Sequence, residues 1–390
     1  MKILFLTSRL PFPPKGGDKL RVFNFIKFLS KKHDIYLISF IESQEEKEHV
    51  EELKQFCKEV ETILLKPLKS YINCILHFFS KNPQQISYYR DTRMCSKIKN
   101  FIKKYEIDAV YTHLIRMAPY AKDLKLFRVL DLTDAISLSL KRSLKYRSHV
   151  FYLFYLLEWL RVKRYEKEII QCFDKCLLVS DIEKNAIENA KNLRNMEIIQ
   201  NGVDFDRLTP SDKPYDDKKI SFVGNLHSFP NRDAVMFFYN DILPLIKKEI
   251  SDIKFYIIGV NPPPRILELN NDKNIVVTGP VEDLKYYLED SACFVCPIRA
   301  GAGLQNKILE AMSLGLPVIT TSIGFEGIKA KEGKDLLVAD KPEDFAEKII
   351  EIIKDENLRN DLSQNAREFI VERYNWEDVV KKLEDVFRKA

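Results

Sequence analysis

The chain has 390 residues, of which 45% are hydrophobic and 31% are charged, which is the composition of a soluble globular protein and the length of two domains. No run of about 18 or more apolar residues occurs and the N-terminus starts directly with a strand pattern, so we expect neither a membrane-spanning helix nor a signal peptide, and a cytoplasmic location. Seven cysteines fit an intracellular chain that has no disulfide framework.

Charge divides the chain into unlike halves. Residues 1–200 carry 36 Lys and Arg against 24 Asp and Glu, a net +12, and residues 201–390 carry 26 against 33, a net −7, which together give the overall +5. A basic half joined to an acidic half indicates different partners for each. The basic half suits an anionic membrane surface, an acidic acceptor or nucleic acid. Because no nucleic-acid-binding motif accompanies the charge, we expect no nucleic-acid partner.

The first half alternates short apolar runs with helical patterns. The run over residues 2–7 predicts a strand, followed by a loop that contains Gly16 and Gly17 and by a helix over residues 20–31. Further strands are predicted over residues 34–40, 61–65, 107–112, 128–134 and 176–180, with a charged helix over residues 44–57. This alternation predicts parallel strands with crossover helices. A GxGxxG fingerprint is absent after the first strand, which disfavours an NAD(P)-dependent dehydrogenase.

Polar side chains follow two of these strands. His113 comes directly after the strand over residues 107–112, and Asp131 and Asp134 lie at the end of the strand over residues 128–134. Residues at the carboxyl ends of parallel strands project into the crevice where α/β proteins bind ligands. His113 is a candidate for hydrogen bonding or proton transfer, with a structural histidine as the alternative. Asp134 is a candidate base, or else the cap of a helix that begins near Ala135.

Two basic segments of the first half carry apolar and aromatic residues. Residues 66–104 predict amphipathic helices, and residues 141–167 predict one long helix in which basic residues flank the apolar block over residues 150–157. The block is too short to span a bilayer. The long helix either lies on a membrane surface, as interfacial helices with basic and aromatic residues do, or is buried between domains with solvated flanks.

The second half restarts the α/β rhythm after a polar segment. Residues 204–219 contain two prolines and five aspartates, which is typical of an exposed linker, and we place the domain boundary there. Strands are predicted over residues 220–224, 254–259, 274–278 and 293–296, with helices over residues 233–240, 281–289, 341–354 and 356–371 and a last helix after Trp376. Cys293 and Cys296 have metal-like spacing, but they lie in an apolar run without a second pair, which favours a buried strand. The whole chain therefore predicts two doubly wound α/β domains facing a central cleft.

A glycine loop followed by a helix stands out in residues 297–320. Gly301 and Gly303 permit a tight turn and a close approach to a ligand, and the helix that starts near Leu304 directs its free N–H groups into that loop. Glu310 shares a helical face with Asn306 and Lys307, so a carboxylate and a cation can contact one polar ligand. A nucleoside diphosphate fits this combination. The alternative is a solvated Glu–Lys pair after ordinary turn glycines.

Ordered motifs over nearly the whole chain resemble the GT-B glycosyltransferases of family 4. The resemblance rests on Gly16-Gly17, Asn201-Gly-Val-Asp204, Phe222-Val-Gly224, Leu304-Gln-Asn-Lys-Ile-Leu-Glu-Ala-Met312 and Gly315-Leu-Pro-Val-Ile319. Pro13-Pro14-Lys-Gly-Gly-Asp18, Arg116-Met-Ala-Pro-Tyr120, Pro230-Asn-Arg-Asp-Ala234 and Gly303-Leu-Gln-Asn-Lys307 are similar to the subgroup associated with bacterial exopolysaccharide biosynthesis. The resemblance implies a GT-B architecture of two Rossmann-like domains.

The resemblance also implies a domain assignment and an activity. Residues 1–205 would bind the acceptor, residues 206–372 would bind the nucleotide-sugar donor, and residues 373–390 would form a helix that packs back on the first domain. The implied enzyme is a metal-independent, hexosyltransferase-type enzyme that retains configuration, needs no cofactor, and uses a nucleotide diphosphate sugar and a glycan or lipid-linked acceptor. The implied location is cytoplasmic and peripheral on the inner face of an anionic membrane.

Individual residues receive roles in the same way. Glu310 would bind the donor ribose, the backbone of Gly301, Gly303 and Leu304 the diphosphate, and Lys307 or Arg299 its charge, which stabilises the leaving group electrostatically. The candidate catalytic residues are His113, Asp134, Arg299 and Lys307. The candidate donor-binding residues are Gly16, Gly17, Gly224, Asn225, Arg232, Gly301, Gly303, Leu304, Gln305, Asn306 and Glu310.

Two positions depart from the family pattern. The family has two glutamates separated by seven residues, and Ala302 stands at the first of these positions. The family's Arg and Lys pair after the first strand of the donor domain is replaced by Asn225, with Arg232 further on. These departures keep two alternatives open: a non-catalytic module that binds nucleotide-sugar or membrane within a polysaccharide complex, and an NDP-sugar epimerase.

Overall fold

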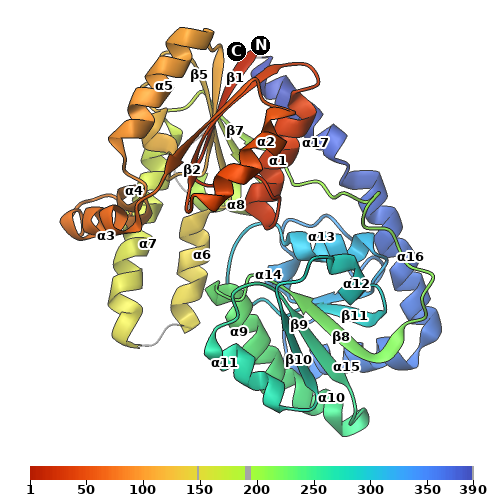
Figure 1. Cartoon of the computed structure of the whole chain (residues 1–390). Coiled ribbons are helices and arrows are strands. Elements are labelled where there is room, and N and C mark those ends of the chain that lie inside the picture. Colours follow the sequence, from red (N-terminus) through yellow and green to blue (C-terminus); the bar gives the residue numbers. More distant parts are fainter. Residues whose placement is uncertain (147–148, 189–194, 389–390) are drawn as a thin grey trace. The chain divides into compact units, whose positions relative to one another are not determined.

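The chain forms two compact α/β units in the computed structural model, which describes residues 1–146, 149–188 and 195–388 (Figure 1). Unit 1 comprises Met1–Asn201 and Trp376–Ala390, and unit 2 comprises Gly202–Asn375. Each unit has a parallel sheet covered by helices on both faces, which confirms the predicted α/β class.

Unit 1 is built on a seven-stranded parallel sheet with the order β3-β2-β1-β4-β5-β6-β7. The strands are β1 (Lys2–Thr7), β2 (Asp34–Ile41), β3 (Glu59–Leu64), β4 (Ala109–His113), β5 (Phe127–Thr133), β6 (Lys175–Leu178) and β7 (Met196–Ile198). The helices are α1 (Gly17–Leu29), α2 (Val50–Lys54), α3 (Pro67–Leu76), α4 (Gln84–Tyr88), α5 (Thr92–Tyr105), α6 (Ile136–Ser143), α7 (His149–Ile170), α8 (Asp181–Glu188) and α17 (Trp376–Phe387), with 3-10 turns η1 (Glu45–His49), η2 (Ala118–Tyr120) and η3 (Leu144–Tyr146). The order reverses between β1 and β4, so their loops meet at the switch point of the sheet.

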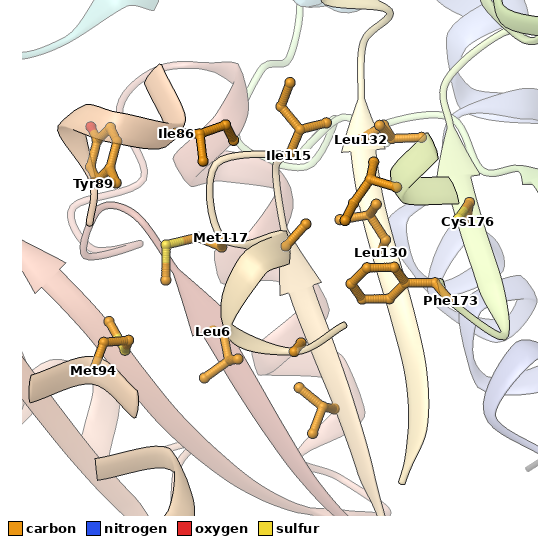
Figure 2. Close-up of a cluster of buried hydrophobic side chains, with 14 of the residues drawn as sticks. Leu6, Ile86, Tyr89, Met94, Ile115, Met117, Leu130, Leu132, Phe173 and Cys176 are labelled. Atoms are coloured by element: carbon orange, nitrogen blue, oxygen red, sulfur yellow. The ribbon is translucent and has the colours of Figure 1, made fainter. Parts of the chain in front are cut away.

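The core of unit 1 has one cluster on each face of this sheet. Leu4 and Leu6 of β1 contribute to one cluster, and Ile3 and Phe5 contribute to the other, because successive side chains of a strand point to opposite faces. The first cluster also includes residues of α5, η2 and α7, and Figure 2 shows part of it around Leu6 and Phe173. The second cluster includes residues of α1 and α17. Trp376 of α17 packs edge to face against Phe25 of α1, with ring centroids 6.1 Å apart. The last helix thus completes the core of unit 1.

Unit 2 repeats the same plan with a six-stranded parallel sheet in the order β10-β9-β8-β11-β12-β13. Its strands are β8 (Asp216–Val223), β9 (Lys254–Ile258), β10 (Ile275–Gly279), β11 (Ser291–Cys296), β12 (Val318–Thr320) and β13 (Leu337–Val338). Its helices are α9 (Phe229–Phe237), the π-turn η4 (Phe238–Ile242), α10 (Leu243–Glu249), α11 (Pro264–Leu267), the 3-10 turn η5 (Glu268–Asn271), α12 (Leu284–Leu288), α13 (Asn306–Ser313), α14 (Ser322–Phe325), α15 (Pro342–Lys354) and α16 (Glu356–Arg373). The switch point lies between β8 and β11.

Two helix predictions are wrong in detail. The charged segment over residues 44–57 forms only the 3-10 turn η1 and the short helix α2. The segment over residues 141–167 is not one helix, because α6 ends at Ser143, the 3-10 turn η3 follows, and α6 and α7 pack on each other. Residues 147–148 of this segment lie outside the described residues. The prediction of a strand over residues 293–296 is confirmed, with Cys293 and Cys296 buried in β11.

A buried ion pair fastens α1 to the sheet of unit 1. The Nε of Arg21 lies 2.6 Å from Oδ2 of Asp131, and both side chains are fully buried. Tyr111 donates its hydroxyl to the same carboxylate, the backbone N–H of Thr133 donates to its other oxygen at 2.9 Å, and Nη1 of Arg21 donates to Oδ1 of Asn201 at 2.7 Å. Burial alone would raise the pKa of Asp131, but the Arg21 guanidinium outweighs it, and the net pKa is lowered. The carboxylate is therefore ionised and fully hydrogen-bonded.

We expect Arg21→Met to destabilise unit 1 by about 3–5 kcal/mol, because the substitution leaves the Asp131 charge buried without its counter-ion. The measurement is urea unfolding followed by tryptophan fluorescence, since both tryptophans, Trp159 and Trp376, belong to unit 1. Lys97→Met is the matched control, because Lys97 forms an exposed pair with Glu61 at 2.7 Å, and its loss should cost at most about 1 kcal/mol. Equal costs for the two variants would contradict this account.

Candidate functional site

The predicted site residues form two groups, one at the switch point of each unit. In unit 2 the candidates from Gly224 to Glu310 lie on the loops after β8 and β11 and on the helices α9 and α13 that follow them. In unit 1 Gly16 and Asp134 lie on the loops after β1 and β5, Gly17 begins α1, and His113 ends β4. Parallel topology brings such loops to one edge of each sheet, which is why residues distant in sequence become neighbours within a unit.

The glycine loop of unit 2 leads directly into α13. Gly301 has φ 120° and Gly303 has φ 85°, a region of backbone conformation that residues with a Cβ rarely adopt. The helix begins at Asn306 and not near Leu304, which is buried in the preceding loop segment. Gln305 occupies the N-cap position without a side-chain hydrogen bond to the first turn. The N–H of Ile308 donates to the carbonyl of Gln305 at 2.9 Å, so the backbone closes the first turn of α13 without a side-chain cap.

Glu310 and Lys307 lie half-buried one turn apart on α13. Burial raises the pKa of Glu310 to about 7, although the charges of Arg207 and Lys307 oppose the rise. Burial also lowers the pKa of Lys307, opposed by Cys296 and Glu310. The carboxyl of Glu310 therefore changes its ionisation near neutral pH, as groups at functional sites often do. Arg207 did not emerge from the sequence because it belongs to the segment that the composition predicts to be a linker.

A chain of hydrogen bonds links α13 to the loop after β8. Lys307 donates to Oδ1 of Asn231, whose Nδ2 donates to the carbonyl of Asn225 at 2.9 Å, and the Lys307 ammonium lies 4.7 Å from the ring centroid of Phe222. Gly224 is required here, since a Cβ at this position would lie 2.7 Å from Cγ of Asn231. Nη1 of Arg232 donates to the carbonyl of His227 at 2.7 Å, which holds Arg232 against the same turn.

Arg299 is held by a carboxylate of its own unit. Its Nε and Nη2 donate to both oxygens of Asp233 at 3.0 and 2.8 Å, and the guanidinium lies 4.1 Å from the ring centroid of Phe237. A bidentate pair of this kind fixes the side chain on α9. Neither Asp233 nor Asn231 was a predicted site residue, although both lie within the motif Pro230-Asn-Arg-Asp-Ala234. Their role was invisible because it depends on contacts between α9 and the loops after β8 and β11.

His113 and Asp134 flank the buried Arg21–Asp131 pair in unit 1. His113 is buried, and burial lowers its pKa to about 4 although Asp131 and Asp18 act to raise it, so the imidazole is neutral at pH 7. Its Nε2 lies 3.4 Å from Oγ1 of Thr133, and Thr133 has φ 62°, a strained conformation for a β-branched residue. Strain of this kind is frequent at functional sites.

The carboxyl of Asp134 does not cap α6. Ala135 occupies the N-cap position, and its N–H donates to Glu183, while the N–H of Ser137 donates to Glu166. Burial raises the pKa of Asp134 to about 7, opposed by Arg21 and reinforced by the charges of Asp131 and Asp18. The carboxyl of Asp134 thus changes its ionisation near neutral pH.

The two glycines of unit 1 lie where the loop after β1 enters α1. Gly16 has φ 95° and is the N-cap residue of α1, and Gly17 is the first residue of the helix. Asp18 follows in the first turn, where a carboxylate interacts favourably with the helix dipole, and it lies 3.5 Å from Nη1 of Arg9.

A cavity of about 550 Å³ lies in unit 1 between α4, α5, η2 and α7. Arg116, Arg90 and Lys122 line it together with the carboxylates of Asp91 and Glu168 and with aromatic and apolar side chains. The Nε of Arg116 is buried without a hydrogen-bond partner, and the guanidinium lies 5.1 Å from the ring centroid of Tyr89. Within the described residues, Arg116 has no carboxylate at ion-pair distance, and no cluster of three or more His, Cys, Asp or Glu is arranged to hold a metal ion.

Residues 217–355 match the family model described as "Glycosyl transferases group 1". This part of the chain is therefore similar to the group 1 glycosyltransferases. An uncharacterised 44.6 kDa protein in the cps region of Klebsiella pneumoniae is 26% identical over 393 residues, covering 98% of each chain. An uncharacterised glycosyltransferase of Methanocaldococcus jannaschii is 28% identical over 361 residues, covering 87% of this chain and 93% of the relative.

A characterised relative and two solved structures complete the comparison. The E. coli UDP-Gal:alpha-D-GlcNAc-diphosphoundecaprenol alpha-1,3-galactosyltransferase is 26% identical over 209 residues, covering 49% of this chain and 54% of the relative. Anabaena HepE in complex with UDP covers 100% of both chains with a TM-score of 0.70 at 14% identity. TarM covers 99% of this chain and 98% of its own with a TM-score of 0.75 at 13% identity. These structures share the GT-B fold.

Replacing Asp134 by Asn should change how the stability of unit 1 depends on pH. The folded-state pKa of about 7 lies above the value near 4 of an unfolded aspartate, so the folded state binds the proton more tightly, and stability falls as pH rises from about 4 to 7. Asp134→Asn removes this loss, and we expect the variant to gain about 4 kcal/mol over wild type between pH 4 and pH 8. Tryptophan-monitored unfolding at both pH values measures the gain. A difference that does not vary with pH would refute the assignment.

Proposed function

We propose that the protein is a retaining, hexosyltransferase-type glycosyltransferase that moves a sugar from a nucleotide diphosphate sugar to a polysaccharide or lipid-linked acceptor. We place the reaction at the cytoplasmic face of a membrane, with no metal ion or cofactor required. The observation that carries the proposal is the half-buried Glu310 on α13, directly after the glycine loop and beside Lys307. A carboxylate, a cation and the N-terminal end of a helix at one place suit the ribose and diphosphate of a nucleotide.

The relatives support the substrate classes. One relative is named for UDP-Gal as donor and for a diphosphoundecaprenol-linked acceptor, and another, from Staphylococcus aureus, is named a poly(ribitol-phosphate) alpha-N-acetylglucosaminyltransferase. The structurally similar HepE has been solved with UDP and glucose. The relative in the cps region of K. pneumoniae spans nearly the whole chain and supports a role in polysaccharide biosynthesis.

In this proposal, unit 2 binds the donor. The carboxylate of Glu310 accepts hydrogen bonds from the ribose hydroxyls, and the backbone of Gly301, Gly303 and Leu304 with the first N–H groups of α13 holds the diphosphate. Gly224, Asn225, Gln305 and Asn306 line the same region. Lys307 stabilises the charge that develops on the leaving diphosphate once its ammonium turns from Asn231. Arg299 and Arg232 act by holding α9 and the turn after β8 in position, since both are engaged there.

In this proposal, unit 1 activates the acceptor. Neutral His113 can hydrogen-bond a sugar hydroxyl, and Asp134, with a pKa of about 7, can take a proton from an acceptor hydroxyl. Gly16 and Gly17 keep the first turn of α1 free of side-chain bulk. The unpaired cation Arg116 in the 550 Å³ cavity suits a phosphate-bearing acceptor, as a lipid-linked glycan is.

Donor-dependent transfer should depend strongly on the Glu310 and Lys307 side chains. We expect Glu310→Ala and Lys307→Ala each to lower kcat/KM by about 10- to 100-fold, because each removes charge-assisted hydrogen bonds worth about 1.5–3 kcal/mol. The assay is nucleoside diphosphate release across UDP-, GDP- and ADP-sugars, after a thermal-shift screen has ranked the nucleotides. Lys329→Ala, an exposed position of unit 2, is the control. Unchanged turnover in both site variants would contradict the assignment of Glu310 and Lys307 to the donor site.

The affinity for UDP should rise as pH increases through about 7. The pKa of Glu310 is raised to about 7, and only the ionised carboxylate can accept two hydroxyl hydrogen bonds from the ribose. Between pH 6 and pH 8 we expect the dissociation constant to fall by about 10-fold, and Glu310→Gln to remove this dependence. Isothermal titration at several pH values measures it. A dissociation constant that does not vary with pH in the wild type would contradict the role of Glu310.

A non-catalytic nucleotide-sugar-binding module is the second candidate. Ala302 lies at the position where the family's first glutamate is expected, and Arg299 is engaged by Asp233. Both observations leave the donor sugar with fewer charged partners in unit 2. Nucleotide binding without release or transfer, across the donors above, would support the module. Robust turnover of the purified protein with any of them would eliminate it.

A further inference from the structure

The exposed hydrophobic side chains of this protein gather on two segments of unit 1. Of the twenty large hydrophobic residues that are exposed among the described residues, seven lie between Leu68 and Phe79 and six between Phe151 and Leu160. Phe79 is 94% exposed and Leu153 is 74% exposed. Monomeric proteins rarely expose apolar side chains in such a concentration unless the surface contacts a partner.

The two segments belong to one surface. The rings of Phe78 and Phe154 stack with centroids 6.4 Å apart and an angle of 15°, and Arg161 donates a hydrogen bond to the carbonyl of Phe78. The N–H of Gln84 donates to Glu158 at 2.7 Å, which ties the chain after α3 to α7. Figure 1 shows α3 and α4 beside α7. We call the exposed hydrophobic side chains of residues 68–79 and 151–160 the α3–α7 surface.

Neither residues 68–79 nor residues 151–160 bury an apolar side chain in the core of the unit. Ser70 is the one buried residue of α3, and α3 is held instead by polar contacts, such as Asn73 Nδ2 donating to the carbonyl of Arg90 at 3.0 Å. On α7 the burial begins at Arg161 and continues through Val162, Glu166 and Ile169, whereas the preceding turns stay exposed. The sequence alternative of a helix buried between domains is therefore not supported for residues 151–160.

The charge of the surface is one-sided. Residues 66–90 carry four basic and no acidic residues, and the described residues of the range 141–164 carry six basic residues and one acidic residue, Glu158. Glu158 is turned inward, where it accepts from Gln84 and lies 3.7 Å from Nη1 of Arg161. Lysines such as Lys81 and Lys163 remain exposed around the apolar side chains. Aromatic and aliphatic side chains fringed by lysines are the composition of segments that lie on anionic bilayers.

We propose that the α3–α7 surface docks the protein on an anionic lipid bilayer, with Phe79 and Leu153 inserted among the lipids. The inference rests on the proposed function, which places the reaction at a membrane, and it assigns the membrane contact to named side chains. Within the described part of the chain, no helix has the length and apolar character to cross a bilayer, so the helices lie at the interface. A second copy of the chain fits less well, because it would oppose two surfaces of the same strong positive charge.

Vesicle flotation with the full-length protein tests the apolar part of the proposal. We expect binding to phosphatidylcholine vesicles that contain about 30% phosphatidylglycerol, and Phe79→Ser/Leu153→Ser should lower the partition coefficient by about 10-fold or more. Leu267→Ser/Tyr286→Ser is the matched control, because both residues are exposed hydrophobics of unit 2. Trp159 of α7 should shift its emission to the blue on binding, while Trp376 is buried in the core.

A second pair of variants tests the charge. Lys81→Gln/Lys163→Gln should weaken binding by about 10-fold near 0.1 M salt, whereas Lys329→Gln/Lys382→Gln, which removes the same charge elsewhere, should not. Arg161 and Arg164 are unsuitable for this test, because Arg161 is buried and Arg164 lies 2.6 Å from Glu168.

The docking proposal would be overturned by equal vesicle binding of wild type and Phe79→Ser/Leu153→Ser, or by no vesicle binding of a wild type that dimerises through this surface in size-exclusion chromatography. An acidic protein that occupies the surface while vesicles do not would overturn it as well. UDP binding by unit 2 is measured in parallel. Its absence in the wild type would overturn the proposed function and leave the vesicle result intact, so the two proposals fail separately.

Discussion

The pairing of Arg21 with Asp131 inside unit 1 sets the conditions for the residues around it. Taking two charges out of water is costly, and the cost is offset only when the geometry is good and the remaining hydrogen-bonding groups are satisfied. Here Tyr111, Thr133 and Asn201 complete the network, so α1, β4, β5 and the last residues before unit 2 are joined at one point. The switch point of the sheet is thereby held by a polar contact in the middle of an apolar core.

The same pair shapes the chemistry of its neighbours. Asp131 and Arg21 both act on His113 and on Asp134, yet burial dominates in each, which leaves a neutral imidazole and a carboxyl that ionises near pH 7. Two groups beside one ion pair thus acquire different protonation behaviour through burial and neighbouring charge. Unit 2 also has a carboxyl with a pKa of about 7, that of Glu310 on α13. Burial raises this pKa, and the charges of Arg207 and Lys307 oppose the rise.

Apolar side chains are distributed very differently over the chain. Both faces of the unit 1 sheet are covered by dense clusters, and α17 from the end of the chain completes one of them. The α3–α7 surface leaves its hydrophobic side chains in water, and α3 and the chain after it are held to their neighbours through polar contacts. Burial of these side chains within the unit would have stabilised α3 without reducing solubility. Their exposure therefore indicates a surface that binds a partner.

The sequence by itself determined the fold class, most strand positions and the glycine loop before α13, because alternating apolar runs and glycines at positive φ are local signals. It also identified Glu310 and Lys307 as neighbours, since they lie one turn apart on a single helix. Tertiary structure alone decided that Arg299 is engaged by Asp233, that Lys307 contacts Asn231, and that α6 and α7 are separate helices. It also decided the ionisation of Glu310 and Asp134, because a pKa depends on burial and on charges that the fold brings together from distant segments.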